Sequence, residues 1–185
     1  MINPAVQIDV DTLSGMAPLR QVAFSLGSNV GDRLGYLQTA VDALRATPGL
    51  TLTAVSSVYE TSPVGPVSEQ GDFLNIIVLA ESTLASMVML ERAQAIEDAF
   101  GRVRTVPGGP RTIDVDLIAV GSRVINTDVL TLPHPRAHER AFVLAPWNEV
   151  DPTAEIVGRG AVADLLGGVD TAGVRRRADL AIETA

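Results

Sequence analysis

The hydrophobic period of residues 20–120 changes repeatedly along the chain, and the order of these changes constrains the fold more than any other feature. Short apolar runs are typical of strands, whereas apolar residues three or four positions apart predict helices. Asp32 suits the N-cap of a first helix, and neither glycine nor proline interrupts the second. The expected elements are a strand at 22–26, a helix between Asp32 and Pro48, a strand at 50–59, a strand at 73–80, a helix at 83–100 and a strand at 112–120.

This order of strands and helices defines a known architecture. It predicts an α/β fold of the α+β type, a ferredoxin-like sandwich whose mostly antiparallel sheet has helices packed on its faces. A chain of 185 residues suits a single domain, which we place at 20–175. Residues 1–19 lack clear periodicity and are predicted to form a weakly ordered leader. The signal fades beyond Asp151, and residues 176–185 are expected to form a tail.

The charged residues exclude several classes of function. All fourteen basic residues are arginine, and 22 acidic residues give a net charge of −8. An acidic surface disfavours nucleic acid, and a chain without lysine forms neither a Walker P-loop nor a Schiff base. The absence of cysteine excludes disulfides, thiolate nucleophiles and cysteine-ligated metals.

The sequence also indicates where the protein works. No uncharged stretch approaches the roughly 20 apolar residues that span a bilayer. The leader carries Asp9 and Asp11 but no basic segment of the kind that opens a secretory signal. We therefore expect a cytoplasmic protein that binds small molecules, with no membrane and no nucleic acid among its partners.

Segment 109–117 alternates polar and apolar residues and is the most informative for function. In a strand, Asp114 and Asp116 share one face with Cα atoms about 7 Å apart. Because like charges repel, we expect a positive group to compensate them. Mg²⁺ suits this role, since it binds one or two carboxylates together with water and phosphate oxygens. The alternative is a pair of exposed aspartates on the solvated face of an edge strand.

Three arginines, Arg102, Arg104 and Arg111, lie in the Gly- and Pro-rich stretch around the start of this strand. Arginine presents paired donors that match phosphate oxygens, and a loop of this composition can carry them over a site. Together with the carboxylates they indicate an anionic ligand bridged by metal, for which Mg–ATP is the obvious candidate. The alternative is that these side chains only solvate a surface loop.

Both histidines of the chain lie within residues 132–142, together with two further arginines. His134 stands between two prolines that restrict its backbone, and we expect it to face a ligand. For His138 a structural role is the commoner expectation.

Six short segments between residues 22 and 152 are weak signals singly but very specific as an ordered set. They are SLGSN at 25–29 with Gly31 and Asp32, YETSPVGP at 59–66, FLN at 73–75, GRVR at 101–104, GPRTIDVD at 109–116, and PHP at 133–135 continuing to Phe142. In these segments the chain resembles the family of 6-hydroxymethyl-7,8-dihydropterin pyrophosphokinases, enzymes of folate biosynthesis.

The resemblance implies transfer of the β,γ-diphosphoryl group of ATP to the hydroxymethyl oxygen of the reduced pterin, with release of AMP. It implies two Mg²⁺ ions on Asp114 and Asp116, and Arg102 and Arg111 at catalytic positions of a mobile loop. The implied nucleotide contacts are Gln94, Arg104, Leu117, Thr131, His134 and Arg140. The implied pterin contacts are Thr61, Ser62, Pro63, Val64, Phe73, Asn75 and Phe142. Association with neighbouring folate-pathway enzymes is a further expectation.

The residue types suit a pterin, because two phenylalanines can sandwich a flat heterocycle while an amide reads its edge. Core packing is the alternative for Phe73 and Phe142. Two other functions explain part of the pattern: a ferredoxin-like module that binds a nucleotide without catalysis, and a metal-dependent phosphohydrolase. Neither accounts for the phenylalanines, Asn75 and the loop at 61–66.

Overall fold

The computed structural model describes residues 17–63, 70–101 and 111–184. At its centre is a sheet of six strands: β1 (Arg20–Ser28), β2 (Leu50–Val55), β3 (Tyr59–Thr61), β4 (Phe73–Ser82), β5 (Asp114–Val120) and β10 (Val174–Arg176). All neighbouring strands of this sheet run antiparallel. The strand order is β10-β3-β4-β1-β5, and β2 also pairs with β4.

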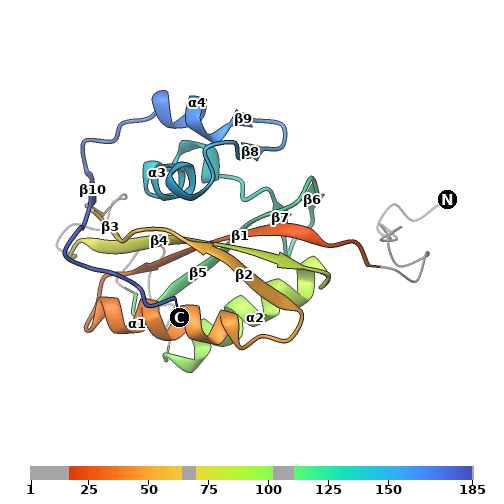
Figure 1. Ribbon diagram of the computed structural model, residues 1–185, viewed down its shortest axis with the longest axis horizontal. Helices are drawn as coiled ribbons and strands as arrows, with labels where there is room; N and C mark the ends of the chain where they lie inside the picture. The colour runs from red at the N-terminus through yellow and green to blue at the C-terminus, as the bar shows by residue number, and fades with distance from the viewer. Residues whose placement is uncertain (1–16, 64–69, 102–110, 185) are drawn as a thin grey trace.

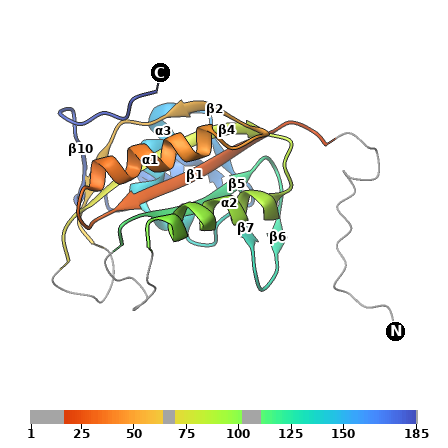
Figure 2. The same ribbon diagram turned by 90° about the horizontal axis from the view of Figure 1, so that it is seen from below.

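Helices cover both faces of the sheet. They are α1 (Arg33–Arg45), α2 (Ser86–Ala99), α3 (Ala141–Val150) and α4 (Val162–Gly167), with a 3-10 turn at Ala137–Glu139. Two hairpins accompany them, β6 (Ile125–Asn126) with β7 (Thr131–Leu132) and β8 (Glu155–Ile156) with β9 (Gly160–Ala161). α1 and α2 lie on one face and α3 and α4 on the other (Figures 1 and 2). The expected α+β class and mostly antiparallel sheet are confirmed.

The alternation of side chains along β1 builds a separate core on each face. Phe24 and Leu26 are fully buried among residues of α1 and α2. Ala23, on the opposite face, packs with Val143 and Trp147 of α3. Because successive strand side chains point to opposite faces, one apolar strand can hold both helix layers.

The first helix begins and ends as its sequence predicts. Asp32 is the N-cap, and its carboxylate accepts a hydrogen bond from the Gly35 N–H at 3.0 Å. This satisfies one of the helix N–H groups that have no partner within the helix. Gly49, beyond the C-terminus, has a φ of +82°, a conformation that favours glycine and turns the chain into β2.

The single strand expected at 50–59 is two strands, β2 and β3, lying along the same edge of β4. The pairing register shifts by one residue between Leu52 and Ala54, and again between Val55 and Tyr59. Between the strands, the hydroxyl of Ser56 accepts the Ile77 N–H at 2.9 Å. A side chain therefore replaces a backbone partner there, and the hydrophobic pattern carries no signal of this substitution.

Residues beyond Asp151 have weak periodicity, yet they form β8, β9, α4 and β10. β10 takes the outer position beside β3, and the boundary we expected between domain and tail falls inside this strand. The chain then crosses to the α1 side, where Leu180 and Ile182 pack against the core. Long-range pairing, which local sequence does not reveal, creates these elements.

Of the expected leader, residues 1–16 lie outside the described residues. Within the described part of the chain, no helix has the length and hydropathy needed to cross a membrane.

The two-sided packing of β1 makes a prediction about stability. Phe24→Ala should lower the free energy of unfolding by about 3–5 kcal/mol, because it leaves a cavity in the core under α1 and α2. Chemical denaturation measures this change. Leu19→Ala is the control, since the Leu19 side chain is 63% exposed just before β1. Equal effects of the two substitutions would contradict the described packing.

Candidate active site

One cavity of about 190 Å³ gathers most of the side chains that the sequence singles out. It lies on the α3 face of the sheet, over the ends of β1, β4 and β5 that are close to α1's N-terminus. Register explains the gathering, because Gly27 of β1 pairs with Asn75 on one side and with Asp114 on the other. The lining residues are Ser25, Gly27, Thr61, Ser62, Phe73, Asn75, Arg111, Asp114, Asp116, Arg136, Arg140 and Phe142.

The floor of this cavity depends on a glycine. A Cβ atom at Gly27 would stand 2.8 Å from Oδ1 of Asn75, closer than such atoms approach. The side chain of Asn75 is itself buried, and its Nδ2 donates to the Thr61 hydroxyl at 2.7 Å. The missing side chain on β1 therefore leaves room for the amide, and Thr61 fixes its orientation.

The two aspartates of β5 are half-buried and face cationic groups. Asp114 forms an ion pair with Arg111. Asp116 lies 3.7 Å from Nη1 of Arg140 and 4.0 Å from Nε2 of His134. The positive charge that the sequence requires beside the carboxylates is thus supplied, in the protein alone, by arginine.

The donor set fits a hard divalent cation. Two carboxylates at alternate positions of one strand face the cavity together. Among the described residues, no group of three or more acidic, histidine or cysteine side chains could hold a metal ion by itself. That suits Mg²⁺, which binds through one or two carboxylates and completes its shell with water and substrate phosphates.

His134 is held as a neutral hydrogen-bond donor. Its backbone N–H donates to the Ile118 carbonyl at 2.8 Å, and its Nδ1 accepts from the Arg136 N–H at 3.1 Å. The proton of the neutral ring therefore belongs on Nε2, the atom that faces Asp116. Burial, reinforced by the positive charge of Arg140, lowers the pKa of His134 to about 4.

Aromatic and polar residues form the other end of the cavity. Phe73 of β4 and Phe142 of α3 contribute walls, and the Arg140 guanidinium lies 5.5 Å from the centre of the Phe142 ring. Thr61, Ser62 and Pro63 continue into an adjoining cavity of about 510 Å³ that also reaches Val174. The site thus joins a charged end to a flat-walled end with amide and hydroxyl groups between them.

The family model of 7,8-dihydro-6-hydroxymethylpterin-pyrophosphokinase (HPPK) matches residues 23–152. The chain belongs to this family. The proposed resemblance is therefore confirmed. Its expected span, residues 22–152, agrees with the matched residues to within one residue at each end.

Curated relatives in the family are similar over most of their length. A 2-amino-4-hydroxy-6-hydroxymethyldihydropteridine pyrophosphokinase of Bacillus subtilis is 44% identical over 143 residues, which cover 77% of this chain and 85% of the relative. The Mycobacterium tuberculosis protein of that name is 45% identical, with 77% of this chain and 78% of the relative covered. The Methylorubrum extorquens protein is 40% identical over 82% and 94% of the two chains.

Solved structures show the same fold. A crystal structure of Plasmodium falciparum HPPK-DHPS matches with a TM-score of 0.66 and 14% sequence identity, over 85% of this chain and 44% of that chain. A second HPPK-DHPS structure, described as a complex with substrates, matches with a TM-score of 0.62. This chain thus spans less than half the length of those chains.

Some residues with implied family roles lie away from the cavity. Leu117 is buried in the core under α1 and α2, so that only its backbone faces the α3 side. Gln94 is exposed on α2, and Thr131 is half-buried on β7 beside β5. Val64, Arg102 and Arg104 lie outside the described residues.

Arg136, one of the two further arginines beside the histidines, lines the cavity, although the sequence leaves its role open. Sequence reasoning missed two other residues that shape the site. The buried Glu97 of α2 accepts the Val115 N–H at 2.8 Å, between the two aspartates. The Asn29 side chain accepts the Arg111 N–H at 2.7 Å and donates to the Gly71 carbonyl at 3.2 Å. The only local signal for these residues was the position of Asn29 at the end of a strand, where asparagine is typical of a turn.

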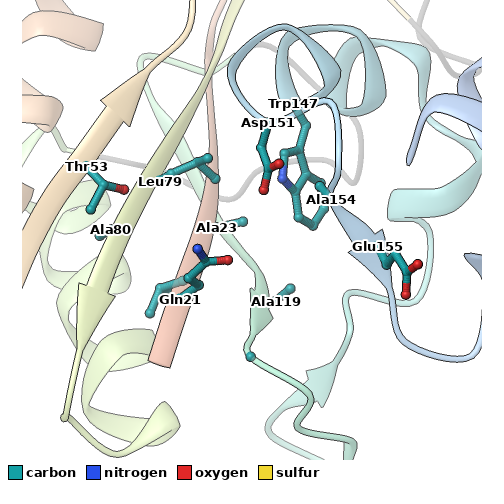
Figure 3. A pocket seen from close by; sticks show the side chains of 12 residues that line it. Gln21, Ala23, Thr53, Leu79, Ala80, Ala119, Trp147, Asp151, Ala154 and Glu155 are labelled. Atoms are coloured by element: carbon teal, nitrogen blue, oxygen red, sulfur yellow. The ribbon is translucent and has the colours of Figure 1, made fainter. Parts of the chain in front are cut away.

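A second cavity, of about 160 Å³, lies at the other end of the same sheet face (Figure 3). Trp147 and Asp151 border it from the α3 side, and Gln21 and Leu79 from the sheet. Among the described residues that line it, none is cationic, and Asp151 and Glu155 are acidic. A polyphosphate would be repelled there, so this cavity is no candidate for the family's chemistry.

The environment of His134 predicts its titration. In His138→Gln, the remaining His134 imidazole should titrate near pH 4 rather than near 6.5, as followed by NMR of its ring protons. The unfolded chain takes up this proton near pH 6.5, so the folded state should lose stability as the pH falls from 6.5 towards 4. A midpoint at about pH 6 or above would show that the ring is not desolvated as described.

Proposed function

We propose that this cavity is the active site in which the chain, as a pyrophosphokinase, transfers the diphosphoryl group of ATP to 6-hydroxymethyl-7,8-dihydropterin. The products are AMP and the pterin diphosphate, an intermediate of tetrahydrofolate biosynthesis. The observation that carries the proposal is the continuity of the site. Asp114 and Asp116 occupy one end, Phe73, Asn75 and Phe142 the other, and all five line one cavity.

Asp114 and Asp116 would hold two Mg²⁺ ions. When bound, the ions would neutralise the triphosphate and polarise the phosphoryl group under attack. The chain's own contribution is to keep two carboxylates on one face of a strand that is paired with β1 and braced by Glu97. That rigidity matters, because catalysis of phosphoryl transfer is mostly positioning and charge stabilisation.

Several donors would bind the triphosphate. Arg111 and Arg140 each face an aspartate, and His134 presents a neutral Nε2–H beside Asp116. Phosphate oxygens accept such charge-assisted hydrogen bonds strongly. We assign Arg111 and Arg102 to catalysis, and Arg104, Thr131, Gln94 and the backbone of Leu117 to the nucleotide. The assignments of Arg102, Arg104, Gln94, Thr131 and Leu117 rest on the family resemblance alone.

The aromatic end would bind the pterin. Phe73 and Phe142 offer flat apolar walls, and Asn75, held by Thr61, offers an amide oxygen to the donor edge of the ring. Ser62 and Pro63 extend this wall, and Val64 follows them in the sequence. Two like walls with an oriented amide between them account for selection of a flat, hydrogen-bonding heterocycle.

We also propose that the protein works in the cytoplasm and associates with neighbouring enzymes of the folate pathway. Support for association comes from the solved HPPK-DHPS structures, in which the matching part forms less than half of a longer chain. A nucleic-acid partner is disfavoured by the net charge of −8.

The role of the carboxylates is testable with isosteric amides. Asp114→Asn and Asp116→Asn should each lower AMP formation from Mg–ATP and the pterin by at least about a hundredfold, because cation binding is worth several kcal/mol to the transition state. The metal-free fold should persist, since the amide keeps an oxygen acceptor beside the arginine, and the Arg111 and Arg140 side chains are 28% and 22% exposed to water. Asp128→Asn, in the exposed turn after β6, is the control.

The same assay separates the alternatives. Pterin-independent release of ADP and phosphate would instead indicate a phosphohydrolase. Nucleotide binding without turnover would indicate a binding module, and unfolding of either metal-free variant would mean that the aspartates are structural.

A further inference from the structure

The strand β10 lies outside residues 23–152, which the family model matches, yet it is built into the site's border. It pairs with β3 so that Val174 stands opposite Thr61 and Arg175 opposite Glu60. One residue further on, the Ser62 N–H donates to the Gly173 carbonyl at 3.2 Å. The blue C-terminal segment accordingly runs along β3 in Figure 1. Thr61 and Ser62, which we assign to the wall of the pterin site (the pterin wall), therefore depend on this segment for their position.

Glu60 is a buried carboxylate on which three arginines converge. Its side chain is 10% exposed and forms ion pairs with Arg175, with Arg177 at 2.8 Å and with Arg33 at 3.1 Å. The hydrogen bond from Arg175 is the largest of several effects that lower the pKa of Glu60. A buried carboxylate stays charged only if it is paired, so these arginines hold Glu60 in one position.

The cluster ties four segments together. Arg33 belongs to α1, Glu60 to β3, and Arg175 and Arg177 to the C-terminal segment. Arg33 also donates to the Asp72 carbonyl at 2.7 Å, just before β4 begins. Both ends of the connection from β3 to β4 are therefore fixed by one set of charges.

Glu60 is adjacent to the pterin wall in the chain but points to the other face of the sheet. Because strand side chains alternate, Thr61 faces the cavity when Glu60 faces α1. Thr61 in turn receives the hydrogen bond from Asn75. A fixed Glu60 therefore fixes the hydroxyl that orients the amide.

β3 is short and depends on its neighbours for its position: it pairs with β4 and β10, and its Tyr59 hydroxyl donates to Glu149 of α3 at 2.6 Å. It has three residues, and without β10 it would be an edge strand paired on one side only. Short edge strands open locally at low cost in free energy. We infer that residues 173–177 are a positioning element of the pterin site, in which Arg175 and Arg177 hold Glu60 so that Thr61, Ser62 and Asn75 are arranged before the pterin arrives.

This role has a kinetic signature. If β3 is correctly placed in only a fraction of the molecules, the apparent affinity for the pterin is lowered in proportion to that fraction. Once bound, the pterin holds the wall in place, so turnover at saturation is preserved. Loss of the positioning element should therefore raise the KM for the pterin and leave kcat and the KM for ATP unchanged.

The test compares the double variant Arg175→Gln/Arg177→Gln with the single variant Arg176→Gln. Arg176 belongs to the same strand and carries the same charge, but it contacts Ser57 and Glu149 instead of Glu60. The double variant should raise the KM for the pterin about tenfold, with kcat and the KM for Mg–ATP within about twofold. Arg176→Gln should leave all three near the wild-type values.

Two further variants keep the outcomes distinct. Arg175→Gln alone changes a side chain that is 71% exposed, so this variant should fold even if the double variant does not. It should raise the KM for the pterin by a smaller factor. Asn75→Ala tests the placement of the pterin, on which this inference rests. If Asn75→Ala raises the KM for the pterin but the arginine variants do not, or if they lower kcat instead, the positioning role is wrong. If Asn75→Ala has no effect, the proposed pterin site itself is wrong.

Discussion

The antiparallel pairing of β1 with β4 and β5 is the constraint on which the rest of the structure depends. Its register sets Gly27 between Asn75 and Asp114, and Ser25 opposite Asp116. A slip of one residue in either pairing would turn a whole set of side chains to the opposite face. The register is secured by burial, because Phe24 and Leu26 must face α1 and α2 while Ala23 faces α3. The cores that stabilise the fold therefore also place the polar groups of the cavity.

Much of this could be predicted because it is local. The period of two in 112–117 set both aspartates on one face, and the capped helical pattern after Asp32 located α1. The break between β2 and β3 could not be predicted, since it depends on a Ser56 hydroxyl that meets a backbone N–H from β4. β10 could not be predicted either, because an arginine-rich run becomes a strand only where β3 offers it a free edge.

In the candidate site, too, residues with a local sequence signal could be predicted and residues that act through long-range contacts could not. Asp114, Asp116, His134 and Arg140 were found from residue types that carry chemistry. The structure places His134 and Arg140 within about 4 Å of Asp116, and it pairs Asp114 with Arg111. Glu97 and Asn29 were missed because their role is to bind backbone groups of distant segments, at 18 and 82 residues of separation. A sequence shows which groups can react, but it does not show which groups hold them in place.

Charge compensation in the cavity explains how an acidic chain can handle a polyphosphate. Without ligands, Arg111 neutralises Asp114, and Arg140 lies beside Asp116. In the proposed function, a triphosphate with its cations would bring both kinds of charge, so the cations would take the place of arginine at the carboxylates and the phosphates that of carboxylate at the arginines. The half-buried charges would then be paired before and after binding, which would avoid the cost of leaving one uncompensated. His134 adds a donor without adding charge, because burial keeps its ring neutral. The net charge of −8 therefore describes the surface as a whole, while the site is governed by pairs that a ligand can exchange.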